Sequence, residues 1–224
     1  MASERKPAAP TRTPLSRERV LRAAIRIADD GGLEALSMRR LAQALGVEAM
    51  TLYHYVARKD DILDSIVELV VSDIPLPAEG EAWRPALRRL AIGAHEQFLR
   101  HRWAAGLTLS ARLKPGRARY MDAILGTLRR GGFSASMAHH GYHAIESHIV
   151  GFTLWLVGIR IGMAEYDGDV PRMLGDLPLS EFPWLAEHID EHRLEDTGGG
   201  AAVSEFEFGL DLILDGLERL RGPE

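Results

Sequence analysis

The segment from Ser37 to Lys59 constrains the fold of this chain more than any other stretch of its sequence. It predicts two short helices around a tight turn. Ser37 is a good N-cap for the first helix, because its hydroxyl can accept a hydrogen bond from an otherwise unpaired backbone N–H. Gly46 predicts the end of that helix, since glycine readily adopts a left-handed backbone. A second helix is expected from about Ala49, so the segment is typical of a helix-turn-helix.

The side chains of this segment divide into an apolar face and a polar face. Leu41 and Leu45 lie four residues apart on one face of the first helix, and Leu52 and Val56 are expected to pack back against Leu41. The remaining side chains of the second helix are polar or aromatic and are expected to point outward. A structural helix that happens to carry aromatic residues is the alternative, and it explains poorly why three aromatic side chains crowd one short helix.

Three stretches of this segment resemble the DNA-binding domain of the TetR family of repressors. They are Leu41-Ala-Gln-Ala-Leu-Gly-Val, Thr51-Leu-Tyr-His-Tyr-Val, and Lys59. A helix-turn-helix pattern alone is a weak indication, whereas the aromatic stretch followed by lysine at this spacing is much more specific. The resemblance implies that the recognition helix and the start of the helix before it meet DNA. It assigns DNA contacts to Arg39, Ala49, Met50, Thr51, Tyr53, His54, Tyr55 and Lys59.

The chemistry of these side chains suits the roles that the resemblance implies. Arg39 can form a bidentate pair with guanine, and Ala49 or Met50 can contact a thymine methyl group. Thr51, Tyr53 and Lys59 are expected to fix the register through phosphates. Arg40, next to Arg39, is expected to point to solvent.

The charge of the chain is unevenly distributed. The formal net charge is −5, which argues against a nucleic-acid partner if the chain is taken as a whole. Residues 1–60, however, hold 11 Lys and Arg against 7 Asp and Glu, whereas residues 161–224 hold 4 against 16. We therefore expect only the N-terminal region to meet phosphates.

Composition indicates a soluble intracellular protein. The 224 residues are 46% hydrophobic, which is enough for a sizeable core. The absence of cysteine excludes disulfides and thiolate metal sites and fits a reducing cytoplasm. No apolar run is expected to reach the length of a membrane helix, and the basic N-terminus is followed by no apolar segment of a signal peptide. We expect a cytoplasmic location.

The whole chain follows helical periodicity, with no convincing strand, so the expected class is all-α. Residues 1–14 are expected to form a flexible basic arm and residues 15–60 a three-helix DNA-binding domain. Residues 61–224 are expected to form a larger helical domain for effector binding and dimerisation. Within it, residues 162–203 read as an irregular acidic connection with one short helix over Trp184 to His192.

The C-terminal region of the chain resembles the C-terminal domain of the tetracycline repressor's own branch of the family, though less specifically. The stretches that carry this resemblance are Trp83, His101-Arg102, Leu109 with Arg112, Gly132-Phe133-Ser134, Gly151-Phe152-Thr153-Leu154 and Phe208-Gly-Leu-Asp-Leu-Ile-Leu-Asp-Gly-Leu-Glu. It implies a ligand cavity between the helices that follow the fourth helix, Lys59 to about Val71. Ligand binding would shift that helix and move a pair of DNA-reading heads apart.

The resemblance places the effector near one set of residues. The corresponding positions are Leu90, Ala94, Thr108, Arg112, Met121 and Ile124, with Phe98, Trp103, Tyr142 and Glu146 nearby. The apolar members are equally compatible with plain core. Arg112 and Glu146 are the stronger candidates, because charged side chains rarely point inward without a partner.

The chain departs from the tetracycline repressor where that protein holds drug and metal. Thr108 occupies the position of the metal-binding histidine, Leu90 and Ala94 occupy the pocket Asn and Phe positions, and Pro75 occupies the position of a second histidine. Magnesium–tetracycline is therefore an unexpected ligand, and a more apolar effector is favoured.

Histidines gather on the helix predicted over Ser134 to Ile161. His139, His143 and Glu146 follow a spacing of i, i+4 and i+7, which could offer two nitrogens and one oxygen to zinc. Positions i and i+7 are about 10 Å apart along a helix, so the three seldom converge on one ion. Together with His140 and His148, these residues are expected to serve effector contacts, dimer contacts or a solvated face. The sequence predicts no metal, no cofactor and no catalytic site.

A homodimer is expected, because one short recognition helix reads too few base pairs. The predicted interface is a four-helix bundle of the long helix and the last helix from each subunit. Its candidate residues are Gly151, Trp155, Gly158, Phe206, Leu210, Ile213 and Leu217. Burial within one subunit is the alternative for about half of them.

The sequence thus predicts a two-domain homodimeric transcriptional regulator. It is expected to be a repressor that binds palindromic operator DNA and is released by a small-molecule effector. An activator on the same fold is an alternative. The rival from another class is a metal-binding or enzymatic helical protein.

Overall fold

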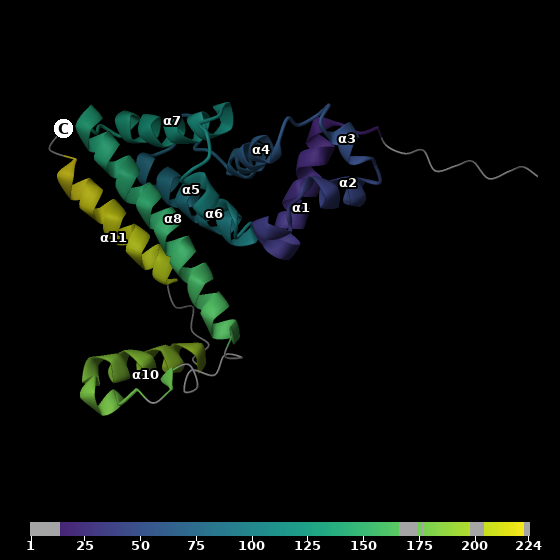
Figure 1. Cartoon of the computed structure of the whole chain (residues 1–224). Helices are drawn as coiled ribbons and strands as arrows, with labels where there is room; N and C mark the ends of the chain where they lie inside the picture. Colours follow the sequence, from purple (N-terminus) through teal and green to yellow (C-terminus); the bar gives the residue numbers. More distant parts are fainter. Residues whose placement is uncertain (1–13, 166–173, 176, 198–203, 222–224) are drawn as a thin grey trace, which may run out of the picture. The chain divides into compact units, whose positions relative to one another are not determined.

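Figure 1 shows a computed structural model of the chain, in which residues 14–165, 174–175, 177–197 and 204–221 are described. These residues form helices and contain no strand, so the expected all-α class is confirmed. The chain divides into two compact units, Met1–Ile66 and Val67–Glu224. The helices are α1 (Arg17–Ala35), α2 (Met38–Leu45), α3 (Ala49–Leu52), α4 (Lys59–Ser72), α5 (Trp83–Arg100), α6 (Ala104–Thr108), α7 (Pro115–Arg130), α8 (Ala135–Glu165), the 3₁₀ turn η1 (Leu179–Glu181), α10 (Pro183–Thr197) and α11 (Glu205–Leu220).

The N-terminal unit holds α1 to α3 and the beginning of α4. Ser16 caps α1 by accepting a hydrogen bond from the Arg19 N–H at 3.2 Å. The backbone of α1 leaves helical geometry at Gly32, where φ is 71°. The core of the unit consists of fully buried apolar side chains from all of its helices, including Val20, Ala24, Leu41, Leu52 and Val56.

The turn between α2 and α3 has the predicted chemistry. The Ser37 hydroxyl accepts a hydrogen bond from the Arg40 N–H at 3.2 Å, and Gly46 is left-handed with φ 66°. The second helix is shorter than expected, because α3 ends at Leu52. Residues 53–55 continue it as a turn, in which the Tyr55 N–H donates to the Leu52 carbonyl at 2.9 Å.

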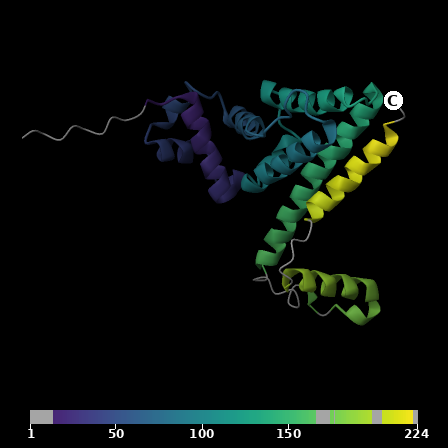
Figure 2. The same cartoon turned by 180° about the vertical axis from the view of Figure 1, so that it is seen from behind.

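The C-terminal unit is built around α8, which packs against α5, α6, α7 and α11. α8 and α11 lie side by side along much of their length (Figures 1 and 2). Two arginine side chains of α5 form ion pairs with acidic residues of α11. Arg88 contacts Asp211 at 2.9 Å and Glu207 at 2.5 Å, and Arg84 contacts Asp215 at 2.5 Å. These carboxylates raise the pKa of Arg88, so the guanidinium remains charged.

The short helix α6 ends at Thr108, and the carbonyls of Thr108, Ala111 and Arg112 bind the Arg117 side chain. Two further helices, α8 and α10, are longer than the sequence-based expectation. The long helix α8 extends past Ile161 to Glu165. In the segment expected to be irregular, α10 is a helix of 15 residues, longer than Trp184 to His192. The basic arm, residues 1–14, lies almost entirely outside the described residues.

By length and composition alone, α8 is long and apolar enough to cross a membrane, with a mean hydropathy of 1.3 over its span Ala135–Gly162. The expectation that no apolar run reaches this length is therefore wrong. The criterion is weak for a single helix, because core helices of globular proteins also meet it. In this chain α8 bears four histidines and Glu146, and one side of it packs against neighbouring helices.

Candidate DNA interface and ligand cavity

The predicted recognition segment, residues 49–55, exposes large side chains to solvent and is anchored by a buried leucine. Met50 is 73% exposed and Tyr53 is 49% exposed, whereas Leu52 between them is completely buried. Arg39, at the start of α2, is exposed as well. Exposed apolar and aromatic side chains on a firmly anchored helix are available to contact base edges and phosphates.

The other predicted DNA contacts also reach the surface. His54 and Lys59 are exposed, and Ala49, Thr51 and Tyr55 are half-buried. The Lys59 ammonium group donates to the Leu33 carbonyl at 3.4 Å, which ties the start of α4 to the chain before α2. Arg40 is exposed beside Arg39, so exposure alone does not distinguish the two arginines.

The start of α4 is also fastened to α1. The Arg17 guanidinium donates to the Asp61 carboxylate at 3.3 Å and to the Ser65 hydroxyl at 2.8 Å. Ser65 is buried, and its hydroxyl in turn donates to the Asp61 carbonyl at 2.6 Å. The first half of α4 is thus held within the N-terminal unit by contacts with one side chain of α1.

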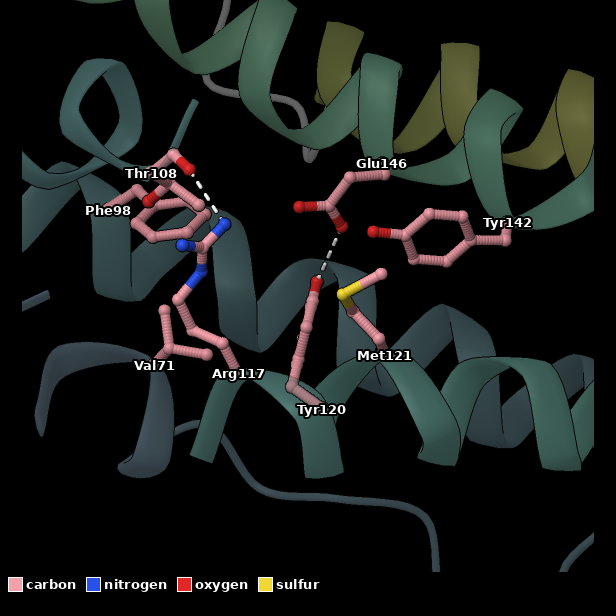
Figure 3. Close-up of a pocket in the computed structure, with 8 residues that line it drawn as sticks. All are labelled: Val71, Phe98, Thr108, Arg117, Tyr120, Met121, Tyr142 and Glu146. Atoms are coloured by element: carbon pink, nitrogen blue, oxygen red, sulfur yellow. Dashed lines mark hydrogen bonds between the residues drawn. The ribbon is translucent and has the colours of Figure 1, made fainter. Parts of the chain in front are cut away.

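A cavity lies in the C-terminal unit between five helices. Its lining comes from α4, α5, α6, α7 and α8 and comprises Val71, Phe98, Thr108, Arg117, Tyr120, Met121, Tyr142 and Glu146. Figure 3 shows Tyr120, Tyr142 and Met121 converging on the Glu146 carboxylate, with Arg117 beside Thr108 and Phe98. Apolar walls with a few converging polar groups are the usual form of a small-molecule site.

The polar end of the cavity is organised around Glu146. The Tyr120 hydroxyl donates to its carboxylate at 3.0 Å. Burial raises the pKa of Glu146, while the hydrogen bond from Tyr120 and the charge of Arg117 act to lower it. Burial and the nearby Glu146 charge raise the pKa values of Tyr120 and Tyr142, so both phenols remain protonated. The site therefore offers one carboxyl group and phenolic hydroxyls at short range.

Arg117 forms the opposite polar end. Its guanidinium donates to the carbonyls of Thr108 at 2.7 Å, Ala111 at 2.6 Å and Arg112 at 3.2 Å. These bonds hold the connection between α6 and α7 against the start of α7. The Thr108 hydroxyl is satisfied within α6, donating to the Ala104 carbonyl at 2.7 Å.

The cavity is nearly closed, with a volume of about 20 Å³. Pockets that hold drug-sized ligands measure roughly 300–1,000 Å³. A ligand of that size therefore has to displace lining side chains. Met121 is the most adaptable of them, because methionine is unbranched and repacks readily.

The structure brings together half of the residues predicted to bind an effector. Phe98, Thr108, Met121, Tyr142 and Glu146 line the cavity. Leu90, Ala94 and Ile124 are completely buried but do not line it, and Trp103 is half-buried elsewhere.

The expectation that Arg112 points inward is wrong. Its side chain is exposed, and its carbonyl is bound by Arg117, which is the cationic group of the cavity. Sequence reasoning also missed Val71 and Tyr120. Arg117, Tyr120, Met121 and Ile124 share one face of α7 at spacings of three and four, a pattern that could have identified the first two.

The predicted dimer residues fall into two groups. Gly151 and Gly158 are exposed, Trp155 is 50% exposed, and Ile213 is half-buried. Phe206, Leu210 and Leu217 are instead buried in the core of the chain itself, which corrects their assignment to an interface. The apolar side chains that α11 exposes are Phe208, Leu212 and Leu220.

The histidines of α8 have different surroundings. His139, His140 and His143 are exposed, and the ring centroids of His139 and His143 are 4.6 Å apart. His148 is half-buried, with its Nε2 atom 2.8 Å from the Phe206 carbonyl. Within the region of the chain that the structure describes, no three His, Asp or Glu side chains are grouped to hold a metal ion.

Comparison with known proteins identifies the family of both parts of the chain. The profile of the "Bacterial regulatory proteins, tetR family" matches residues 20–66, and that of the "Tetracyclin repressor-like, C-terminal domain" matches residues 76–221. The chain is 31% identical to the HTH-type transcriptional repressor DrrR1 of Streptomyces coeruleorubidus, covering 96% of this chain and 82% of that protein. It is 30% identical to the class C tetracycline repressor protein of Escherichia coli, covering 92% of each.

Solved structures show the same architecture. The TetR family protein ActR of Streptomyces coelicolor, in complex with actinorhodin, superposes with a TM-score of 0.70 at 28% identity. The alignment covers 94% of this chain and all of that one. With family profiles matching most of the sequence, this chain belongs to the TetR family of DNA-binding transcriptional regulators.

Proposed function

We propose that this chain is a repressor that binds a two-fold-symmetric operator as a homodimer and is released by a small molecule in the C-terminal cavity. The observation that carries this proposal is the course of α4. The helix begins at Lys59, directly after the recognition segment, and its Val71 lines the cavity. A ligand that displaces the cavity wall therefore acts on the helix that leads into the DNA-binding unit. We place this transcriptional regulator in the cytoplasm, where it would meet its operator.

The roles of the two domains follow from this proposal. Residues 15–60 form the DNA-binding domain, and residues 61–224 form the effector-binding and dimerisation domain. DNA contact is made by the exposed side chains of the recognition segment, with Arg39 reading a base pair. Lys59 and the polar residues of the segment fix the register on phosphates.

The homodimer is supported by an unpaired apolar surface. Trp155 and Ile159 on α8 and Phe208 and Leu212 on α11 are 41–61% exposed. The two helices lie side by side, and exposed apolar side chains on both are a feature that marks interfaces. Gly151 and Gly158, exposed on the same helix, permit a close approach of a second helix.

The cavity also indicates the chemistry of the effector. The sequence favoured a largely apolar molecule, but the lining includes Arg117, Glu146 and two tyrosines. A ligand with an apolar ring body and hydrogen-bonding groups fits such a lining better, because its ring can pack on the apolar walls while its polar groups pair with the few polar side chains. We therefore propose a hydroxylated or otherwise polar aromatic effector.

Selection of bound DNA from a random pool tests the DNA half of this proposal. The purified full-length protein is expected to enrich a two-fold-symmetric consensus, with half-site centres about 34–36 Å apart or a multiple of this spacing. Sedimentation of the protein with the enriched DNA is expected to show two chains per site. Failure to enrich any palindrome would sink the proposal.

Thermal unfolding with two probes tests the effector half. Tetracycline with magnesium is expected to leave the melting temperature unchanged, since Thr108 stands where the metal-binding histidine is expected and its hydroxyl already donates to Ala104. Actinorhodin, the ligand of ActR, is expected to raise the melting temperature, because a ligand that binds only the folded state stabilises it. A rise with magnesium–tetracycline, or a rise with actinorhodin that Glu146→Gln leaves unchanged, would contradict the assignment of the site.

A further inference from the structure

One carboxylate of α4 caps the start of α7. Glu68 accepts hydrogen bonds from two successive backbone N–H groups, that of Gly116 at one oxygen and that of Arg117 at the other, at 3.2 Å. The N-cap residue of α7, Lys114, makes no side-chain capping bond. The helix therefore takes its cap from a different helix, 48 residues earlier in the chain.

This cap accounts for the free donors in the first turn of α7. The first N–H groups of a helix have no partner within it. Pro115 at the first position has no N–H, and the Ala118 N–H already donates to the Lys114 carbonyl at 2.9 Å. The N–H groups of Gly116 and Arg117 lie between them, and both are bound by Glu68. A carboxylate here also interacts favourably with the helix dipole.

The cap depends on a close approach between the two helices. Gly116 is buried, and a Cβ atom at this position would collide with the Ser72 hydroxyl and lie 2.8 Å from the nearer Glu68 oxygen. Any side chain at residue 116 would therefore push the start of α7 away from the last turns of α4. Glycine is required here for space.

The residue after Gly116 faces the cavity. Arg117 receives Glu68 at its backbone and extends its guanidinium into the cavity wall, where it binds the carbonyls of Thr108 and Ala111. Its charge also acts on Glu146 and Tyr142 across the cavity. A ligand that moves the Arg117 side chain or the first turn of α7 therefore acts on the Glu68 cap directly.

We propose that the Glu68 cap on α7 is the contact through which occupancy of the cavity reaches α4. The inference rests on the proposed function, since it assigns a route for the response to an effector. Glu68 does not line the cavity, so it is a positioning residue rather than a ligand-binding one. Opening the cavity draws the start of α7 away from α4 and loosens the cap, and the second half of α4 loses its hydrogen bonds to α7.

The geometry of α4 suits this role. Asp61, Ser65 and Glu68 are spaced by four and three residues, so they lie on one side of the helix. The first two are held by Arg17 in the N-terminal unit, and the third is held by α7 in the C-terminal unit. Loosening the Glu68 contact releases the second half of α4 from α7, while Arg17 keeps the first half fixed to α1.

Hydrogen exchange of the full-length protein tests this coupling without DNA or an effector. Met121→Trp serves as a built-in occupant of the cavity, and Tyr142→Trp is a second filler placed on α8. In the wild-type background, either filler is expected to speed amide exchange in residues 69–73 about fivefold. In the Glu68→Gln background, the same filler is expected to change this exchange by less than about twofold. An equal response in both backgrounds, or no response in either, would overturn the proposal.

Glycine variants of α7 supply a matched pair. Gly116→Ala is expected to uncouple α4 from the cavity as Glu68→Gln does, because the added Cβ collides with Ser72 and Glu68. Gly126→Ala, in the same helix, would meet only the flexible end of Arg130 at 3.0 Å and is expected to keep the full response. A full response in Gly116→Ala would contradict the role of the close approach.

Affinity for the enriched palindrome gives a second readout. Filling the cavity is expected to weaken DNA binding about tenfold in the wild-type background and less than about twofold in the Glu68→Gln background. Glu96→Gln, at an exposed glutamate of α5, is the control and is expected to keep the tenfold loss. If no palindrome is enriched, the proposed function fails, whereas the exchange measurement still decides whether Glu68 couples the cavity to α4.

Discussion

The recognition segment and the cavity differ in how far their functional side chains are exposed to water. In the recognition segment, one buried leucine anchors a helix of four residues whose functional side chains face solvent. In the cavity, polar groups from several helices are withdrawn from water and depend on one another for hydrogen bonds. In the first region, the exposed side chains, such as Arg39 and Met50, can be changed with little effect on the fold. In the second region, a change to one polar group alters the energy of its neighbours.

In the N-terminal unit, a substitution at an exposed residue is therefore expected to change binding without changing the stability of the fold. In the C-terminal unit, a substitution in the cavity is expected to change both. Exposed residues such as Arg39 contribute little to the folded state, so their variants report on DNA alone. Glu146 contributes to both, because burial of its carboxyl group is offset only partially by Tyr120 and Arg117. The substitutions below test this contrast and are given in order of decreasing expected effect.

The largest effect is expected at the anchor of the recognition helix. Leu52→Ala leaves a cavity in the core of a small helical unit and is expected to lower the free energy of unfolding by about 2–5 kcal/mol. Met50→Ala, two residues earlier and 73% exposed, is expected to change it by less than about 0.5 kcal/mol. Urea unfolding of the two variants measures the contrast. An equal loss of unfolding free energy in the two variants would contradict the contrast between the buried and the exposed side of α3.

The next effect concerns DNA alone. Arg39→Ala is expected to cost about 1–3 kcal/mol of operator affinity and to relax specificity at one base pair, because a bidentate pair with guanine is lost. The free energy of unfolding is expected to stay unchanged. Arg40→Ala, at the neighbouring exposed arginine, is the control and is expected to leave specificity intact. If Arg39→Ala weakens binding to all sequences equally, Arg39 is only a backbone contact.

A change inside the cavity is expected to act on the fold. Tyr120→Phe removes the hydrogen bond to Glu146 and is expected to lower the free energy of unfolding by about 1–3 kcal/mol, the cost of a buried polar group without its partner. The same change is expected to raise the pKa of Glu146 further, because the lost bond acts to lower it. Tyr142→Phe keeps the Tyr120 bond and is the control. NMR titration of the Glu146 carboxyl group measures this pKa in each variant. A lower pKa in Tyr120→Phe than in the wild type would contradict the prediction.

The smallest effect is a pH dependence at His95. This buried histidine stacks on Phe206 at 4.0 Å, with its Nδ1 atom 2.7 Å from the Thr153 hydroxyl. Burial, followed by the charges of His148 and Arg160, lowers its pKa from 6.5 to about 4. A lowered folded-state pKa gives stability that is present above the unfolded pKa and is lost as the pH falls toward the folded value.

Between pH 7.5 and pH 6, this loss is expected to reach somewhat less than about 1 kcal/mol, because only the unfolded chain takes up the proton. His95→Gln is expected to remove this contribution to the pH dependence of the free energy of unfolding. The check is the free energy of unfolding of both proteins at the two pH values. An identical slope in the variant would exclude His95 as its source.

The two regions also differ in how much of them the sequence predicts. The caps at Ser37 and Gly46 and the burial of Leu41 and Leu52 depend on neighbours within a few residues, so local chemistry was enough. The length of α3 was not predicted, because it depends on the turn bonds that follow Leu52.

The cavity depends on contacts between residues far apart in the chain, which the sequence does not encode locally. Arg112 and Arg117 are the same type of residue and lie five residues apart. The second of them binds carbonyls at the end of α6 and in the connection that follows, and this choice depends on how α6 and α7 pack rather than on the residue type. In α11, one stripe of apolar residues faces the core and the other faces solvent. The sequence singled out Phe206, Leu210 and Leu217, but helical periodicity does not decide whether such a stripe faces the core or a partner chain.

The central claim is that the state of the cavity sets the affinity of the recognition segment for DNA. Titration of Met121→Trp and wild-type protein with the palindrome selected by the wild type tests it most directly, with circular dichroism to verify that both are folded. The predicted result is a loss of about tenfold in affinity for a folded variant whose substitution lies in the C-terminal unit. Unchanged affinity in the folded variant would contradict the claim.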